Sequence, residues 1–377
     1  MPSSLLSTEI SDPVNARILA VSEDRIAGFH QDPFVEIARL CDLPVETVVD
    51  RLRAMLESGV VRRIRQTLMA TNLAPGALVA WRVPAERLDA AFDYLAAEDP
   101  FSGHVVIRST DAETQGSVYR LWTTLKVPQG FSMERHCELL AQRIGADAFR
   151  IMPAKCLFAL GVGHIRRRGM EPGSRSDELG EVLDTNLVEL SALEWRVLAA
   201  LKRELAPHEV RVEPWRGRAD EAGVAYEEFL RVARGLSGRR VIGRFSSFLE
   251  HVKPSAAGER ATRYNALFHW RVPVGREIEA GREVGRHHIL THAYWREGGA
   301  EFANVNIMAV AHGTEKQTVL AHKAGIDRHL EEAGIPVTYT NVFWGGRSEI
   351  KPSEIMPQAY EAWCRAQGVD PAVMRAP

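Results

Sequence analysis

The sequence of 377 residues has few cysteines, little net charge and no long hydrophobic run. Its four cysteines lie far apart and form no C-x-x-C pair, which excludes a zinc ribbon and a disulfide framework and fits a reducing compartment. No apolar run approaches the ~18–20 residues that span a bilayer, and the first residues lack the pattern of a secretion signal. A formal net charge of −2 removes the bulk electrostatic argument for a nucleic-acid-binding protein. We therefore expect a cytoplasmic protein of two or three domains that does not bind a membrane.

What the sequence does contain is an internal repeat. Residues 77–84 and residues 266–273 are identical at six of eight positions. Further matches in the same order pair residues 60–64 with 241–245 and residues 119–122 with 305–308. Because the order is kept over three separated segments, we interpret the chain as a tandem duplication.

Each copy begins with the pattern of a helix–turn–helix. In the first copy, apolar residues recur at helical spacing in segments 15–21, 34–40 and 45–58, with a break at residues 42–44. Gly59 ends the last of these helices, and residues 60–65 predict the strand of a wing. The second copy repeats the pattern from residue 187 to residue 238, with a more irregular middle.

The rest of each copy follows the order strand, helix, strand, strand, helix, strand. The expected strands are 77–83, 104–109, 118–127 and 149–161, then 266–272, 287–295, 303–311 and 336–343. The expected helices are 85–97, 132–144, 276–285 and 317–332, with one more around 359–366. This order is typical of a ferredoxin-like, split βαβ antiparallel sheet. The predicted fold class is α+β: a tandem duplication of a winged helix-turn-helix and a ferredoxin-like sheet domain.

These patterns place the domain boundaries. The first winged helix takes residues 1–72 and the first sheet domain 73–165. A linker at 166–186, rich in Arg, Gly and Glu, precedes the second winged helix at 187–252. The second sheet domain takes 262–347, after a longer loop near 254–262, and a tail of 348–377 ends the sequence.

Polar side chains gather in the second sheet. Regular alternation along strand 287–295 would put one set of residues on a single face: His288, Leu290, His292, Tyr294 and Arg296. The neighbouring strand adds Asn304, Asn306, Met308 and His312, and the first copy offers His104, Arg108, Tyr119, Trp122 and Lys126. Several histidines together favour a functional site about as much as a structural role. No motif of a metal site, a phosphate loop or a nucleophile elbow is present.

A winged helix also raises the hypothesis of a transcription factor. Its phosphate-binding face would consist of Arg51, Arg53, Arg62, Arg63 and Arg65. Acidic residues interrupt the helix, and Thr47, Val48 and Leu52 are poorly suited to reading base edges. The composition therefore favours this hypothesis less than a site in the sheet.

Three segments of the sequence resemble the siroheme decarboxylases of the wider Lrp/AsnC-like group. They are residues 57–64 at the end of the winged helix, residues 119–125, and residues 152–158 with the sequence MPAKCLF. In the second copy, residues 291–294 resemble the family's Ser/Thr-His-Cys-Tyr segment, and Asn306 and His312-Gly313 match its later strand. The resemblance covers about residues 12–165 and 187–345. Two segments depart from it: residues 107–110, where the family often has Ser-His-Asn-Tyr, and residues 342–347.

The resemblance implies an activity: decarboxylation of the acetate side chains of siroheme to methyl groups. The product would be 12,18-didecarboxysiroheme, in heme d1 or alternative heme biosynthesis, with no cofactor beyond the iron of the substrate. Siroheme is then the expected partner rather than nucleic acid, and a homodimer is compatible with the family. The alternatives are an Lrp/AsnC-type DNA-binding regulator and a tetrapyrrole sensor without catalysis.

The resemblance also assigns roles to residues. His292 or His312 would protonate the methylene carbon, with Tyr294 as a weaker donor, and His292 is also a candidate axial ligand of the substrate iron. The expected substrate-binding residues are Arg108, Tyr119, Trp122, Lys126, Arg286, His288, Arg296 and Asn306, whose cations would hold carboxylates.

Overall fold

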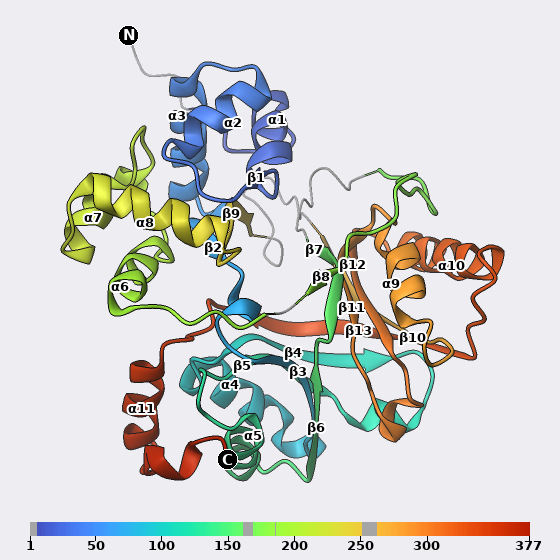
Figure 1. Ribbon diagram of the computed structural model, residues 1–377. Helices are drawn as coiled ribbons and strands as arrows, with labels where there is room; N and C mark the ends of the chain where they lie inside the picture. Colours follow the sequence, from blue (N-terminus) through green and yellow to red (C-terminus); the bar gives the residue numbers. More distant parts are fainter. Residues whose placement is uncertain (1–5, 161–168, 185, 251–261) are drawn as a thin grey trace. The chain divides into compact units, whose positions relative to one another are not determined.

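The computed structural model describes residues 6–160, 169–184, 186–250 and 262–377 (Figure 1). They form two compact units. The winged-helix unit contains the described residues within 1–69, 161–169 and 188–263, and the sheet unit those within 70–160, 170–187 and 264–377. The two winged helices thus fold together, and so do the two sheet copies. The loop expected near 254–262 and the start of the expected linker lie almost wholly outside the described residues.

Both copies form the predicted helix–turn–helix. The helices are α1 (Pro13–Ser22), α2 (Pro33–Cys41) and α3 (Val45–Glu57), then α6 (Ala192–Leu201), α7 (Arg216–Ala222) and α8 (Tyr226–Gly238). Asp12 caps α1 by accepting hydrogen bonds from the N–H groups of Val14 and Asn15, and Asp42 ends α2 in a left-handed conformation with φ of 51°. The wing strands β2 (Val61–Leu68) and β9 (Ile242–Leu249) pair antiparallel, and β9 also pairs with β1 (Ile26–Ala27).

The sheet unit contains one sheet of ten strands built from both copies. The first copy supplies β3 (Gly76–Arg82), β4 (Ser102–Thr110), β5 (Leu121–Lys126), β6 (Ala148–Pro153), β7 (Cys156–Leu160) and the short β8 (Leu183–Asp184). The second copy supplies β10 (Tyr264–Arg271), β11 (Leu290–Trp295), β12 (Ile307–Gly313) and β13 (Tyr339–Ile350). The strand order is β6-β3-β5-β4-β13-β10-β12-β11-β7-β8. Strands β6-β3-β5-β4 and β13-β10-β12-β11 repeat one ferredoxin-like order, which confirms the duplication and the fold class.

The last strand of each copy corrects the predicted boundaries. The expected strand 149–161 is two strands, because β6 pairs with β3 whereas β7 pairs with β11 of the other copy. Likewise β13 continues beyond the expected end at residue 343, since its second part pairs with β4. The chain passes from β6 to β7 across only Ala154 and Lys155, so the two ends of the sheet meet. Strands 287–295 and 303–311 also start later than expected, at Leu290 and Ile307.

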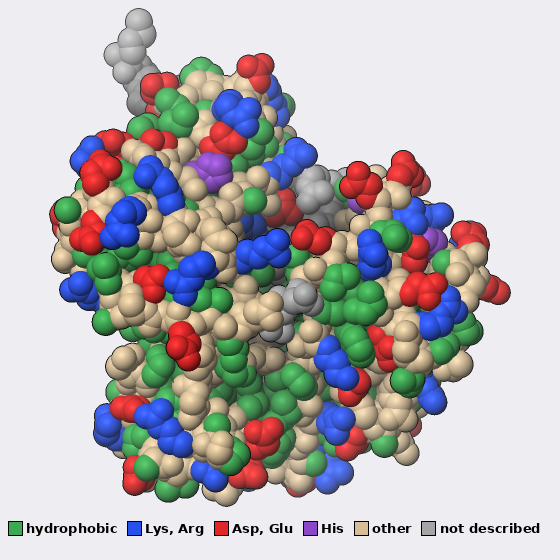
Figure 2. All heavy atoms as spheres, in the orientation of Figure 1, with side chains coloured by type: hydrophobic (Ala, Val, Ile, Leu, Met, Phe, Trp, Pro, Cys, Tyr) green, Lys and Arg blue, Asp and Glu red, His purple; other side chains and the backbone are tan. Residues whose placement is uncertain are grey.

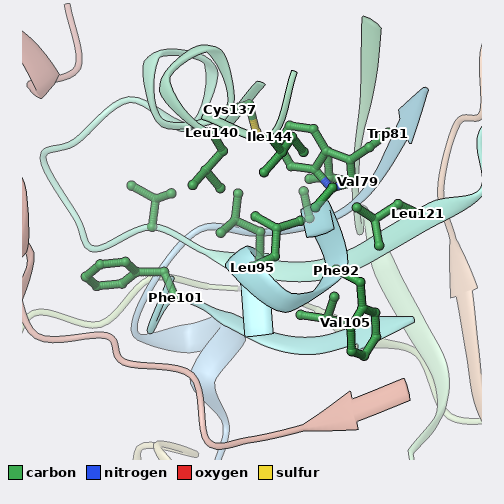
Figure 3. Close-up of a cluster of buried hydrophobic side chains, with 14 of the residues drawn as sticks. Val79, Trp81, Phe92, Leu95, Phe101, Val105, Leu121, Cys137, Leu140 and Ile144 are labelled. Carbon is green, nitrogen blue, oxygen red and sulfur yellow. The ribbon is translucent and has the colours of Figure 1, made fainter. Parts of the chain in front are cut away.

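Helices cover one face of the sheet. They are α4 (Leu88–Glu98), α5 (Met133–Ile144), α9 (Glu277–Gly285), α10 (Lys316–Glu332) and the tail helix α11 (Pro357–Ala366). Figure 3 shows how Cys137, Leu140 and Ile144, at helical spacing on α5, face Val79 and Trp81 of β3. Each fully buried side chain of this kind contributes about 1.5–3 kcal/mol. Nowhere in the described part of the chain does a helix have the length and apolar character needed to cross a membrane.

The opposite faces of the two halves pack on each other and form a separate core. Its members come from both copies: Ala80, Val106, Tyr119, Trp122, Met152, Leu267, Phe302, Val305, Met308 and Phe343. The rings of Trp122 and Phe343, one from each half, are 5.1 Å apart. We call this the inner face of the sheet, and it carries the candidate site.

Candidate active site on the inner face of the sheet

A chain of hydrogen bonds crosses the inner face of the sheet from β4 to β11. Arg108 Nη1 donates to Asn265 Oδ1 at 3.1 Å and to the carbonyl oxygen of Phe343 at 3.2 Å. Asn265 Nδ2 lies 3.0 Å from His312 Nε2. Thr291 Oγ1 lies 3.4 Å from His312 Nδ1 and 3.1 Å from His292 Nδ1. We call Arg108, Asn265, Thr291, His292 and His312 the histidine subsite.

The hydrogen-bond partners define the protonation of His312. Arg108 has only donors, so Asn265 must turn its amide oxygen toward the guanidinium and its NH2 group toward His312. His312 Nε2 is then an acceptor, and the proton of the neutral ring is on Nδ1, which faces Thr291. Thr291 in turn donates its hydroxyl proton to the carbonyl oxygen of Val310 at 3.1 Å. Arg108 therefore orients an imidazole that it does not touch.

Three further side chains stand on the same face. The rings of His292 and Tyr294 are nearly parallel, with centroids 5.9 Å apart, and the guanidinium of Arg296 lies 4.5 Å from the centroid of the Tyr294 ring. Arg296 also donates to the carbonyl oxygen of Met152. Lys126, at the end of β5, lies close enough to Arg296 for the two charges to repel. The structure therefore brings together six predicted site residues: Arg108, Lys126, His292, Tyr294, Arg296 and His312.

The expected alternation along this strand is wrong at its start. A β-bulge between Leu290 and His292 shifts the register against β12. As a result Leu290 packs in the helix-covered core, while His292, Tyr294 and Arg296 remain together on the inner face. His288 precedes β11, and its backbone N–H donates to the carbonyl oxygen of Ser174.

The cations of the site lack acidic partners. Within the part of the chain that the structure describes, no carboxylate forms an ion pair with Arg108, Lys126 or Arg296. Burial lowers the pKa of Arg108 to about 9. Burial, with the nearby charge of Arg296, lowers the pKa of Lys126 to about 8. Buried charges in proteins are normally paired, so cations without an acidic partner on this face are candidates for binding an anion.

Four other predicted site residues are packed, hydrogen-bonded or ion-paired within the fold. Tyr119 and Trp122 are buried in the inner core, where Trp122 Nε1 donates to the carbonyl oxygen of Tyr119 at 2.7 Å. Asn306 bonds to the backbone of Val272 and to Glu277. Arg286 follows α9 and is paired with Glu283 at 2.7 Å. The structure does not bring these residues, or His288, into the histidine subsite.

One inner-face residue, His269, was not predicted. It is 1% exposed, its ring contacts those of Trp122 and Phe343, and its Nε2 atom has no hydrogen-bond partner. Burial and the charge of Arg108 lower its pKa to about 3, so the ring is neutral. Arg108 Nε is also buried without a partner. The signal in the sequence was inside the repeat, where His269 replaces Ala80 of the first copy.

Among the described residues, no group of three or more His, Cys, Asp or Glu side chains is placed to hold a metal ion. His292 and His312 are imidazoles on the inner face, and an imidazole is a common ligand of iron within a macrocycle. An iron that arrives with the substrate would thus meet suitable donors.

Residues 74–159 match the model of a family described as the AsnC-like ligand binding domain, so the first sheet copy is similar to this class of ligand-binding domains. The chain is 24% identical over 281 residues to the siroheme decarboxylase NirDL subunit of Paracoccus pantotrophus. The aligned residues cover 71% of this chain and 77% of that protein. The fold is also that of the crystal structure of the siroheme decarboxylase NirDL, with a TM-score of 0.64, 18% identity and coverage of 93% of this chain and 98% of that one. A second crystal structure of NirDL, in co-complex with an iron-uroporphyrin III analogue, gives a TM-score of 0.64 at 18% identity and covers 94% of this chain and 99% of that one.

Proposed function

We propose that this protein is a siroheme decarboxylase that converts acetate side chains of siroheme to methyl groups. The observation that carries the proposal is a set of three cations without acidic partners among the described residues, the buried Arg108 and Arg296 and the half-buried Lys126, on the same sheet face as two histidines. Siroheme is a macrocycle with many carboxylates, so it suits a site of this charge. The similarity to NirDL proteins supports the same substrate. The reaction would belong to the biosynthesis of heme d1 or to the alternative pathway of heme biosynthesis.

The arginines and the lysine bind carboxylates of the substrate, and a histidine supplies the proton. Arg108 and Arg296 hold substrate carboxylates by charge-assisted hydrogen bonds. When the bond between the methylene carbon and the carboxylate breaks, carbon dioxide leaves and the electron pair stays on the carbon. A proton from His292 or His312 then forms the methyl group. The iron and the macrocycle come with the substrate, so we propose that no other cofactor is needed.

The geometry gives the two histidines different surroundings. Asn265, fixed by Arg108, holds His312, whereas His292 stacks on Tyr294. Both rings contact Thr291 Oγ1, so the same hydroxyl helps to position both imidazoles. We propose a cytoplasmic location, because all four cysteines are buried free thiols.

The winged-helix unit does not favour the alternative of a DNA-binding regulator. Arg53 of α3 donates to the carbonyl oxygen of Val210 at 2.7 Å, and Arg51 pairs with Asp12 at 3.3 Å. Arg63 pairs with Glu204 at 3.1 Å. Three of the five arginines expected to bind phosphate are thus engaged within the chain. On the face shown in Figure 2, basic and acidic side chains are interspersed.

Anaerobic incubation with siroheme, followed by mass spectrometry, tests the proposal. We expect a product lighter by two molecules of carbon dioxide, without any added cofactor. His292→Ala and His312→Ala are expected to lose about 10²–10⁴-fold in rate, the range for general acid catalysis. The control is His208→Ala, which removes an exposed histidine of the winged-helix unit.

Two outcomes contradict the proposal. Siroheme that binds with a stable Soret band and no change of mass would indicate a sensor. Absence of siroheme binding, with sequence-specific retardation of DNA that depends steeply on salt, would indicate a regulator.

A further inference from the structure

The two halves of the sheet match each other residue by residue around the candidate site. On the first copy, Lys126 of β5 stands opposite Gly76 of β3. On the second copy, His312 of β12 stands opposite Asn265 of β10. Since β5 and β12 are the same strand of the repeat, Lys126 occupies the position of His312, and Gly76 that of Asn265.

The arginines correspond in the same way. Val106 stands opposite Trp122, and Tyr294 stands opposite Met308, which is the equivalent residue of the repeat. Arg108 and Arg296 each follow two residues later, so they are equivalent as well. Arg108 donates to the carbonyl oxygen of Phe343 and Arg296 to that of Met152. Phe343 and Met152 face equivalent residues of the repeat, Leu267 and Leu78. Each arginine therefore binds the same backbone position of the other copy.

A histidine also has its counterpart. The register of β4 shifts between Ser102 and His104, as that of β11 shifts between Leu290 and His292. His104 stands opposite Thr124, two residues before Lys126, and His292 opposite Val310, two residues before His312. The first copy thus has a histidine at this position, which corrects the alignment of residues 107–110 with the family's histidine segment.

We propose that Lys126, Arg296 and His104 form a second subsite for an anionic side chain of the substrate, in which Lys126 protonates the carbon left by the departing carboxylate. We call it the lysine subsite. This inference rests on the proposed function and assigns one acetate to each subsite. At the lysine subsite the carbon–carboxylate bond breaks, carbon dioxide leaves, and the ammonium N–H bond donates its proton to the methylene carbon. Water then reprotonates the neutral amine.

The surroundings of Lys126 suit a proton donor. No carboxylate among the described residues pairs with it, and the charge of Arg296 disfavours its protonated form. With a pKa of about 8, its ammonium is a stronger acid than an ordinary lysine and is still protonated near neutral pH. The side chain keeps some exposed surface, so a bound anion can reach it.

Gly76 leaves the room that this arrangement needs. A Cβ atom at residue 76 would stand 2.9 Å from Lys126 Nζ. The asparagine that orients His312 in the histidine subsite would displace the ammonium here. The two exchanges therefore go together: histidine with asparagine in one subsite, lysine with glycine in the other.

The two subsites are far enough apart to act on different side chains of one macrocycle. Arg296 directly follows β11, four residues after His292. At the rise of about 3.3 Å per residue of extended backbone, their Cα atoms are separated by about 13 Å. One bound substrate can then lose both carboxyl groups without having to rotate in the site.

The ratio of singly to doubly decarboxylated product tests the inference. Lys126→Met is expected to stop after one molecule of carbon dioxide, with the second step slowed about 10²–10⁴-fold. Lys126→Arg keeps the charge but is too weak an acid to give up the proton, so it should stop at the same point. Lys126→His should complete both steps, with the alkaline limb of its pH profile moved to lower pH. Lys351→Met is the control, because the ammonium of Lys351 bonds only to carbonyl oxygens at the end of α4.

The outcomes separate the two proposals. Wild-type protein that releases no carbon dioxide refutes the proposed function itself. Wild-type protein and Lys126→Met that form the double product at equal rates refute only the lysine subsite. Lys126→Arg with wild-type rates, or Lys126→His that stops after one step, refutes Lys126 as the proton donor. Thermal unfolding of each variant shows that it is folded.

Discussion

Replacing Arg108 by methionine should stabilise the protein without substrate and weaken its binding of siroheme. The guanidinium is 4% exposed and pairs with no carboxylate among the described residues. Its charge is therefore held in place by the fold at a cost, which substrate carboxylates would offset. Active sites commonly store instability of this kind.

The magnitude follows from the pKa. A value of about 9, against 12.5 for an ordinary arginine, corresponds to about 5 kcal/mol at about 1.4 kcal/mol per pKa unit. Methionine would remove this cost but leave Asn265 Oδ1 and the carbonyl oxygen of Phe343 without their donor, at about 1–3 kcal/mol each. The net change in the free energy of unfolding then lies between a loss of about 1 kcal/mol and a gain of about 3 kcal/mol, and we expect the midpoint, a gain of about 1 kcal/mol. Loss of one charge-assisted contact should weaken siroheme binding by about 10–100-fold.

Urea denaturation at pH 7 without substrate, together with titration of siroheme, measures both effects. The control is Arg347→Met, because Arg347 is an exposed arginine paired with Asp89 and Asp93. Surface pairs contribute about 0–1 kcal/mol, so the control should change stability little and binding not at all. An Arg108→Met protein that is less stable than the wild type and binds siroheme equally well would refute the reasoning.

Two further predictions concern buried histidines. His269 has a pKa of about 3 in the folded protein, below the ordinary 6.5, so it opposes folding as the pH falls from 6.5 toward 3. Between pH 7 and pH 5, the free energy of unfolding of His269→Phe, measured by urea denaturation, should therefore fall by about 2 kcal/mol less than that of the wild type. An unchanged pH dependence would contradict this. Tyr360→Phe removes the hydroxyl 3.0 Å from Nδ1 of the buried His136 and should lower the free energy of unfolding by about 1–3 kcal/mol, whereas an equal melting temperature would argue against that bond.

The repeat predicted much of the fold. Identity at six of eight positions marks β3 and β10, and the order of elements after them defines one ferredoxin-like half in each copy. Helix ends followed from local signals such as Asp42 and Gly59, both with positive φ. The exchange of the last strands could not be predicted. Residues 149–153 and residues 156–160 are both mainly apolar, and nothing local distinguishes pairing within one copy from pairing between copies.

The site was predicted in part for a similar reason. Histidines and cations at alternate positions of β11 indicated a functional face, and His292, Tyr294 and Arg296 do share it. The bulge that turns Leu290 away from them depends on the partner strand and leaves no mark in the sequence. His269 was missed because a single histidine in an apolar strand is usually structural.

The exchange of strands explains why the two copies belong together. Arg108 comes from the first copy but orients the histidine of the second, while Arg296 comes from the second copy and stands beside the lysine of the first. Each subsite thus takes its arginine from one copy and its proposed proton donor from the other, so neither copy alone contains a complete subsite. In a dimer of identical chains, one sequence would have to serve both subsites. A chain that carries both copies frees them to diverge, and the pairs His312–Asn265 and Lys126–Gly76 show that divergence at the positions where it bears on proton transfer.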